Sequence, residues 1–111
     1  MAFKLVVSDT VVVPVRGTIL DDAGASQSFH YSLVCTRLPA DDLRESLADS
    51  SDTMANFLRQ RVVTGWTGVL GGDDRPLEFS DAALSTLFRV PGMAAVAFRA
   101  YLDNVGAKGK N

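Results

Sequence analysis

Hydrophobic and polar residues alternate through the first third of the chain, in two separate runs. The first run places valine or isoleucine at residues 11, 13, 15 and 19, with Arg16 and Thr18 between them. The second run continues the alternation with Phe29, Tyr31, Leu33 and Cys35. Alternation with period two places successive side chains on opposite faces of a β-strand. The two runs therefore predict two strands, each with one apolar face.

The segment between the runs predicts an antiparallel hairpin, because Asp21-Asp22-Ala23-Gly24 is typical of a turn. A turn centred near Gly24 would place Gly17 opposite Tyr31, whose ring would cover the space left by the missing side chain. Pro14 has no backbone N–H to donate, so the first strand should lie at an edge of the sheet. A third strand is indicated by a shorter N-terminal alternation of Phe3, Leu5 and Val7.

From Pro39 onward the apolar residues follow helical spacing. Pro39 suits the first position of a helix, and Asp41 and Asp42 suit the positive end of its dipole. The polar run Asp49-Ser50-Ser51-Asp52 should end this helix and provide the N-cap of the next one. A second, amphipathic helix is indicated by the spacing of Met54, Phe57, Leu58 and Val62.

Two further helices are predicted towards the C-terminus. Ser80 is a favourable N-cap for the third helix, Pro91 separates it from the last helix, and Gly106 should end that helix. The sequence therefore predicts an α+β fold, with an N-terminal antiparallel β-hairpin or three-stranded sheet followed by about four short helices packed together. We expect a single domain over residues 1–105 and a flexible C-terminal tail over residues 106–111.

Four glycines precede the third helix, and we interpret them as turn residues. Gly71-Gly72 is not followed by Lys-Ser or Lys-Thr, as a phosphate-binding loop would require. Gly65-Trp66-Thr67-Gly68 has the spacing of a nucleic-acid-binding G-x-x-G loop but no basic residue beside its glycines. Turn formation therefore explains these glycines better than ligand binding does.

Composition excludes several classes of function. The chain has 111 residues and a formal net charge of −2 at pH 7. Phosphate contacts need a basic surface, so we expect no nucleic-acid partner. No apolar run is long enough to span a bilayer, so we expect no membrane partner and a cytoplasmic protein. The single cysteine, Cys35, leaves no partner for an internal disulfide.

The residues that most often carry chemistry do not form a recognisable active site. Cys35 and His30 should project from opposite faces of one strand, where they cannot share a hydrogen bond. Metal binding needs several ligands, and His30 is the only histidine. The carboxylates near Asp41 suit a solvated helix face. We therefore expect no catalytic residues, no metal and no cofactor, and we predict that the protein is not an enzyme.

The last helix has very little polar surface. Between Met93 and Val105 only Arg99, Asp103 and Asn104 are strongly polar, and Arg99 and Asp103 should form an i, i+4 pair. One interpretation is a central core helix wrapped by the others. The alternative is an apolar surface that binds a partner chain or a second copy. The candidate partner-binding residues are Trp66, Ala94, Phe98, Tyr101, Leu102 and Val105. For Trp66 a core position is the competing interpretation.

An ordered set of motifs resembles the tail assembly chaperones of long-tailed bacteriophages and prophages. The motifs cover most of the chain, and each alone is an ordinary core or turn pattern. They are Phe29-x-Tyr31-x-Leu33-x-Cys35-x-Arg37-Leu38-Pro39, Gly65-Trp66-x-Gly68-Val69, Pro76-Leu77-x-Phe79-Ser80, Ala83-Leu84-x-x-Leu87-Phe88, Val90-Pro91-x-Met93 and Ala100-Tyr101-Leu102. The polar turn at Gly71-Gly72 departs from the more acidic turn expected in that family.

The resemblance implies a non-enzymatic protein that binds the phage tape measure protein, keeps it soluble and helps to recruit tail tube subunits. It also implies a location in the host bacterial cytoplasm and absence from the mature virion. The alternative is a structural virion component, such as a tail tube or head–tail joining protein. A tube subunit should be rich in β-structure throughout, so the apolar last helix favours the chaperone.

Overall fold

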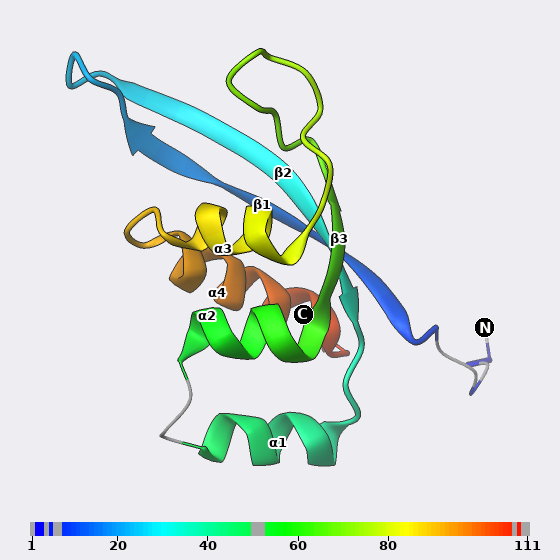
Figure 1. Ribbon diagram of the computed structural model, residues 1–111. Helices are drawn as coiled ribbons and strands as arrows, with labels where there is room; N and C mark the ends of the chain where they lie inside the picture. The colour runs from blue at the N-terminus through cyan, green and yellow to red at the C-terminus, as the bar shows by residue number, and fades with distance from the viewer. Residues whose placement is uncertain (1, 4, 6–7, 50–52, 108, 110–111) are drawn as a thin grey trace.

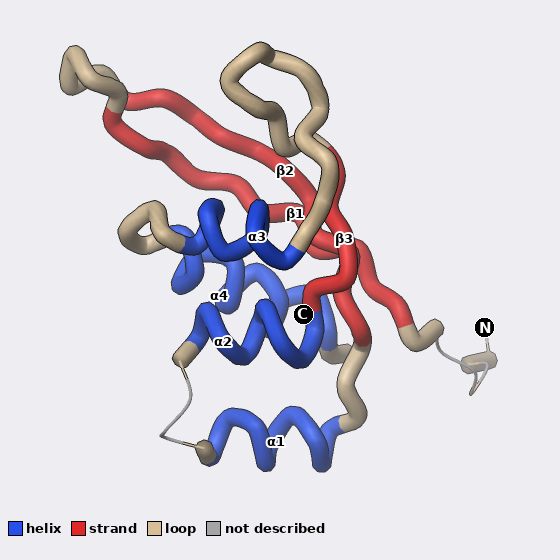
Figure 2. Tube along the Cα trace, viewed as in Figure 1, coloured by secondary structure: helices blue, strands red, loops and turns tan. Residues whose placement is uncertain are grey.

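The protein has an α+β fold, as the sequence predicts. The computed structural model describes residues 2–3, 5, 8–49, 53–107 and 109. A three-stranded antiparallel sheet is accompanied by helices on one of its sides, with α1 lying farthest from the sheet (Figures 1 and 2). The elements are β1 (Thr10–Leu20), β2 (Ser26–Thr36), α1 (Ala40–Ala48), α2 (Met54–Phe57) with its π-helical continuation η1 (Leu58–Val62), β3 (Val63–Thr67), α3 (Asp81–Phe88) and α4 (Met93–Val105).

The β1–β2 hairpin forms with a register two residues away from the predicted one. Gly17 pairs with Phe29 instead of Tyr31. The reason is a three-residue loop: the Asp21 N–H donates to the carbonyl oxygen of Ala25 at 2.9 Å. Gly24 is the third loop residue, with φ +81°, and not the centre of the turn. A shift of two residues preserves the alternation, so the apolar residues stay on the predicted face.

An aromatic ring does cover Gly17, but the ring belongs to Phe29. A Cβ atom on Gly17 would lie only 2.8 Å from Cζ of Phe29. Tyr31, which the predicted register placed there, is buried two pairs further on and lies opposite Val15. Its hydroxyl donates a hydrogen bond to Sδ of Met93 at 3.1 Å. The inner face of the hairpin is thereby joined to the first turn of α4.

The third strand is β3, and the prediction of an N-terminal third strand was wrong for the described residues. Phe3 and Leu5 are 76% and 87% exposed and belong to no strand, while Val7 lies outside the described residues. The segment around Trp66, predicted as turns, instead pairs antiparallel with β2. A bulge shifts its register, since Val34 faces Gly65 whereas Cys35 faces Val63. The extra residue breaks the period-two pattern that would have revealed this strand.

The core lies between the inner face of the sheet and the helices. In α4 the buried residues recur every four positions, which gives one continuous inward stripe. β1 and β2 are the edge and the centre of the sheet, so Pro14 lies in an edge strand as predicted. The buried residues are Val13, Val15, Tyr31, Leu33, Cys35, Phe57, Leu58, Val62, Val63, Leu84, Met93, Ala97, Tyr101 and Val105.

The helix boundaries follow the sequence signals with two differences. Pro39 was predicted as the first residue of the helix, but it is the N-cap, and α1 begins one residue later at Ala40. The N-cap of α2 is Thr53, whose Oγ1 accepts from the backbone N–H of Asn56 at 3.1 Å. The cap was expected within the preceding polar run, of which residues 50–52 lie outside the described residues. Ser80 caps α3 as predicted, because its Oγ accepts from the N–H of Ala83 at 3.0 Å.

One arginine connects the segment just before β1 to the end of α4. Arg37 follows β2, and its Nη1 donates to the carbonyl oxygen of Val105 at 2.6 Å, at the end of α4. Its Nε donates to the carbonyl oxygen of Ser8 at 3.2 Å, just before β1. A cation at a helix C-terminus interacts favourably with the helix dipole. Arg37 therefore fixes the end of α4 against the base of the hairpin.

Candidate partner-binding surfaces

The structure divides the six candidate residues between the core and the surface. Tyr101 is fully buried and Val105 is almost so, since both lie on the inward stripe of α4. In this structure these two side chains therefore offer almost no surface to a partner. Leu102 is 37% exposed, and Phe98 and Ala94 are half-buried. The interpretation of α4 as a core helix is therefore correct for one stripe and not for its flanks.

Tyr101 is buried with its hydroxyl fully engaged. The hydroxyl donates to the carbonyl oxygen of Thr36 at 2.9 Å and accepts from the N–H of Leu38 at 3.4 Å. Its ring meets the ring of Phe57 edge-on at 6.0 Å. Burial raises the pKa of the Tyr101 phenol above its ordinary value. These contacts make Tyr101 a link between α4, α2 and the end of β2.

The exposed flank of α4 lines a groove beside α2. Phe57 of α2 packs edge-on against Phe98 at 5.7 Å, which sets the two helices side by side. Met54 is 46% exposed at the start of α2 and forms the opposite wall. The groove is open and has a volume of about 440 Å³. We call it the α2–α4 groove; it is lined by Met54, Ala95, Phe98, Arg99, Leu102 and Asp103.

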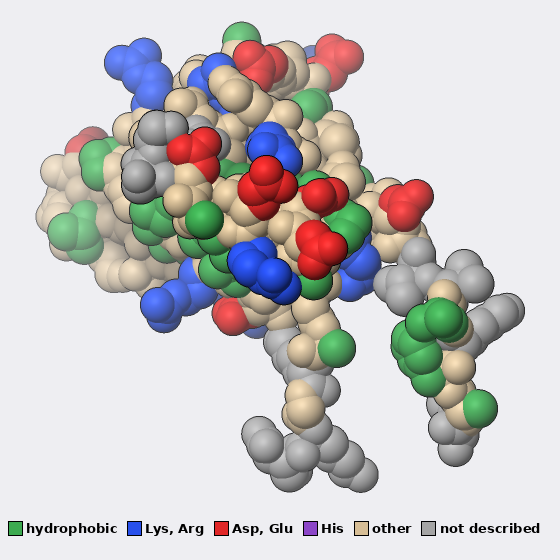
Figure 3. Space-filling view, turned by 90° about the horizontal axis from the view of Figure 1, so that it is seen from below, with side chains coloured by type: hydrophobic (Ala, Val, Ile, Leu, Met, Phe, Trp, Pro, Cys, Tyr) green, Lys and Arg blue, Asp and Glu red, His purple; other side chains and the backbone are tan. Residues whose placement is uncertain are grey.

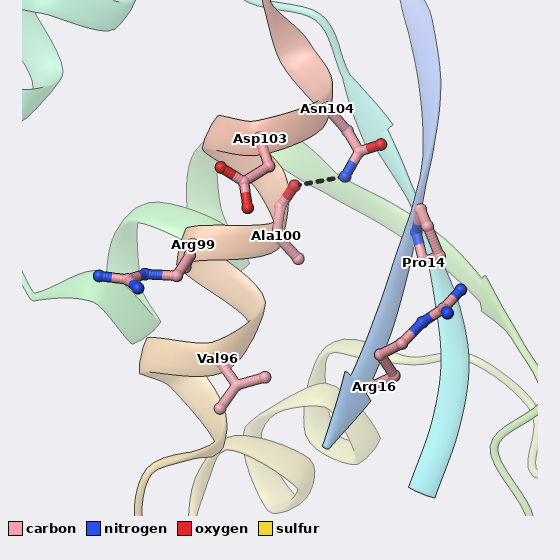
Figure 4. Close-up of a pocket in the computed structure, with 7 residues that line it drawn as sticks. All are labelled: Pro14, Arg16, Val96, Arg99, Ala100, Asp103 and Asn104. Carbon is pink, nitrogen blue, oxygen red and sulfur yellow. Dashed lines mark hydrogen bonds between the residues drawn. The ribbon is translucent and has the colours of Figure 1, made fainter.

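The charged residues of this groove are not paired with each other. Arg99 and Asp103 were expected to form an i, i+4 pair, but no ion pair joins them among the residues that the structure describes. The side chain of Arg99 extends away from β1, on the flank of α4 that borders the groove (Figure 4). The rim of an apolar groove thus offers one cation and one anion to a partner.

Trp66 serves the packing of a loop. Its Nε1 donates to the carbonyl oxygen of Leu77 at 2.8 Å, and its half-buried ring meets Phe79 edge-on at 5.2 Å. These contacts hold the loop between β3 and α3 over the end of the sheet. Leu70, in the same loop, is 55% exposed. Trp66 therefore does not lie with the other candidates, and the structure brings together only Phe98 and Leu102, with Ala94 on the same helix.

Sequence reasoning missed Met54 as a residue of this surface. Met54 was assigned to the apolar face of an amphipathic helix, and that assignment is correct for Phe57, Leu58 and Val62. Met54 is the first residue of α2, and its side chain lies at the exposed start of that helix. The spacing of the sequence does not show that this residue borders a groove. Met54 and Leu102 meet at one groove only because α2 packs against α4.

Cys35 and His30, the two side chains most suited to chemistry, lie on opposite faces of β2. Cys35 is buried, and burial raises the pKa of its thiol to about 12. His30 is exposed on the opposite face of β2. Among residues 2–3, 5, 8–49, 53–107 and 109, no group of three or more His, Cys, Asp or Glu side chains could hold a metal ion. Across that same part of the chain, no helix is long and apolar enough to cross a membrane.

Comparisons of the chain with protein-family models, with curated proteins and with solved structures find no match.

Proposed function

We propose that this protein is a tail assembly chaperone of a long-tailed bacteriophage or prophage. In this role it binds the tape measure protein in the host bacterial cytoplasm, keeps it soluble and helps to recruit tail tube subunits. The order of motifs along the sequence supports the family. The single structural observation that supports the binding role is the α2–α4 groove. It exposes apolar side chains beside Arg99 and Asp103, which form no ion pair within the described residues.

The groove suits an amphipathic helix. Met54, Phe98 and Leu102 offer apolar contacts that a partner helix could cover with residues at i, i+3 and i+4 spacing. A tape measure protein is a very long helical chain, so its exposed apolar stripes need such cover before assembly. Burial contributes roughly 25 cal/mol per Å² of apolar surface, which makes a short groove a site of modest affinity. Modest affinity lets tube subunits displace the chaperone later.

Co-expression tests this proposal. The tape measure protein of the same phage or prophage is produced with and without this chain, and its soluble fraction is measured. We expect the chain to raise that fraction. A Leu102→Asp variant should lose the effect, because a carboxylate would face the apolar surface of the partner helix. The proposal fails if the large protein stays equally insoluble with and without the wild-type chain.

Leu70→Asp is the matched control for this experiment. Leu70 is more exposed than Leu102 and lies in the loop between β3 and α3, outside the groove. Both variants introduce the same carboxylate, and circular dichroism checks that both fold. If both variants lose the increase in soluble fraction equally, the α2–α4 groove is not the binding site. Finding the protein in purified phage particles would instead support the structural virion component.

A further inference from the structure

β1 has one edge that is free to pair with another strand. The sheet order is β1-β2-β3, so β1 pairs only with β2. The N–H of Asp21 donates to Ala25, and the N–H of Arg37 donates to the carbonyl oxygen of Asp9. Hydrogen-bonded pairs recur at every second residue, so odd-numbered residues of β1 direct their peptide groups to β2. Even-numbered residues direct theirs outward, where no strand pairs with them in the part of the chain that the structure describes.

A second flank of α4 runs beside this free edge. Val96, Ala100 and Asn104 recur every four residues and face β1 (Figure 4). The open groove between helix and strand has a volume of about 410 Å³, and Pro14 and Arg16 line its other side. A strand added to β1 would lie about 4.8 Å from it, with alternate side chains directed to the α4 side. The groove therefore offers unpaired backbone groups and a mixed wall, in which Arg99, Asp103 and Asn104 lie beside the small or apolar Val96 and Ala100.

We propose that this groove binds an extended segment of another protein as a fourth strand of the sheet. The side chains of that segment that face α4 are small or apolar, and one of its outward side chains is a carboxylate opposite Arg16. Arg16 is exposed and has no ion-pair partner among the described residues. Its cross-strand neighbour on β2 is His30, so no acid of β2 lies opposite it. An acidic residue on the added strand provides the missing cross-strand partner.

Pro14 and Arg16 disfavour the other possible occupant, a second copy of this chain. Residue 14 is even-numbered, so its missing N–H lies on the free edge and not in the β1–β2 ladder. Two β1 edges paired antiparallel about residues 14 to 16 would lack an N–H at each Pro14 and bring the two Arg16 side chains close together. Proline and charge are the means by which natural edge strands resist self-pairing. An acidic partner strand turns Arg16 into a favourable contact.

Binding of a synthetic peptide to the whole chain tests the proposal. The probe is a capped seven-residue peptide that alternates valine and threonine, with one glutamate at a central threonine position; a second peptide has lysine there. We expect the glutamate peptide to bind about tenfold more tightly, because attraction to Arg16 is replaced by repulsion. In the complex, amide hydrogen exchange should slow at Val12, Arg16 and Thr18. It should not change at Val13 and Val15, whose amides already face β2.

Charge reversal gives the matched controls. Arg16→Glu should reverse the preference in favour of the lysine peptide. Arg44→Glu makes the same change of net charge on α1, at a side chain 80% exposed, and should leave the preference unchanged. The proposal is overturned if neither peptide binds saturably, if binding leaves the even-numbered amides unprotected, or if Arg16→Glu does not change the preference. Concentration-dependent protection of those amides without peptide would also overturn it, by showing a second copy at the edge. The α2–α4 groove shares Arg99 and Asp103 with this groove, but residues of β1 line only the groove proposed here, so protection of the β1 amides separates the two sites.

Discussion

At the scale of single residues, Tyr101 shows that the sequence of an apolar helix does not reveal which of its sides faces the core. The residues of α4 are apolar on nearly every side, so hydrophobicity alone does not show which side faces the core. The inward stripe is defined by Met93, Ala97, Tyr101 and Val105. The partners of the Tyr101 hydroxyl are backbone groups of Thr36 and Leu38, more than sixty positions earlier in the chain. No local pattern in the sequence contains that information, so the sequence left open whether Tyr101 lies in the core or on a partner-binding surface.

We predict that Tyr101→Phe destabilises the protein more than Tyr31→Phe does. Removing the Tyr101 hydroxyl leaves the partly buried carbonyl of Thr36 without this donor, which costs about 1–3 kcal/mol. The Tyr31 hydroxyl donates to a thioether sulfur, which is a weak acceptor, so its loss should cost less than about 1 kcal/mol. Urea denaturation of the two variants measures both values. Equal losses of unfolding free energy in the two variants would show that the hydrogen bonds of the Tyr101 hydroxyl to the backbone stabilise the protein no more than the Tyr31 contact does.

At the scale of elements, strands and helices were predictable where their patterns are regular. β1 and β2 have continuous periods and α4 is an apolar run between Pro91 and Gly106, so the sequence placed all three. β3 was missed because its bulge puts Val63 and Trp66 on the same inner face three positions apart. The hairpin register was missed because Gly24 was taken as the centre of the turn and not as its third residue. Both errors come from backbone irregularities that leave no trace in the hydrophobic pattern.

α1 is attached to the rest of the molecule by very little packing. It buries none of its residues, and Leu43 is its only half-buried large apolar side chain. Leu47, its i+4 neighbour, is exposed. Seen from the α1 side, charged side chains occupy the middle of the molecule, and hydrophobic side chains appear between and beside them in separate groups (Figure 3). A helix with so few buried contacts contributes little to the stability of the core.

We predict that α1 opens locally without unfolding the rest of the protein. Local stability follows the number of buried apolar contacts, and α4 has a complete buried stripe where α1 has none. Native-state hydrogen exchange should therefore give opening free energies for α1 amides at least about 1 kcal/mol below those of α4. The amides of Ala97 and Tyr101 are the reference for global unfolding. Equal opening free energies in the two helices would contradict this prediction.

At the scale of the whole molecule, the sequence indicated the fold class but not the distribution of apolar surface. One interpretation of the sequence gave the last helix an exposed apolar surface that a partner would cover. Exposed apolar side chains instead occur on several elements, from Leu20 at the hairpin tip to Leu70, Met54 and Leu102. Phe98 and Leu102 belong to a candidate surface only because α2 lies beside them. Such a surface depends on how elements pack, and packing between distant segments is what a single sequence reveals least.

Three weak acids lie in the core: the thiol of Cys35 and the phenols of Tyr31 and Tyr101. Burial raises the pKa of the Cys35 thiol and of the Tyr31 phenol to about 12, and it raises that of the Tyr101 phenol as well. The native state therefore keeps these protons at pH values where the unfolded chain has released them. Alkaline pH must favour unfolding through this difference in bound protons.

We predict that stability is independent of these groups below pH 9 and falls between pH 9 and about 12. The unfolded thiol ionises near 9.0 and the unfolded phenol near 10.0, whereas the folded Cys35 and Tyr31 ionise at about 12. Each group can lower the unfolding free energy by up to about 1.4 kcal/mol per pH unit within its window. Urea titrations at successive pH values measure the slope. Cys35→Ala should delay its onset to pH 10, and an unchanged onset in that variant would exclude the thiol as the cause.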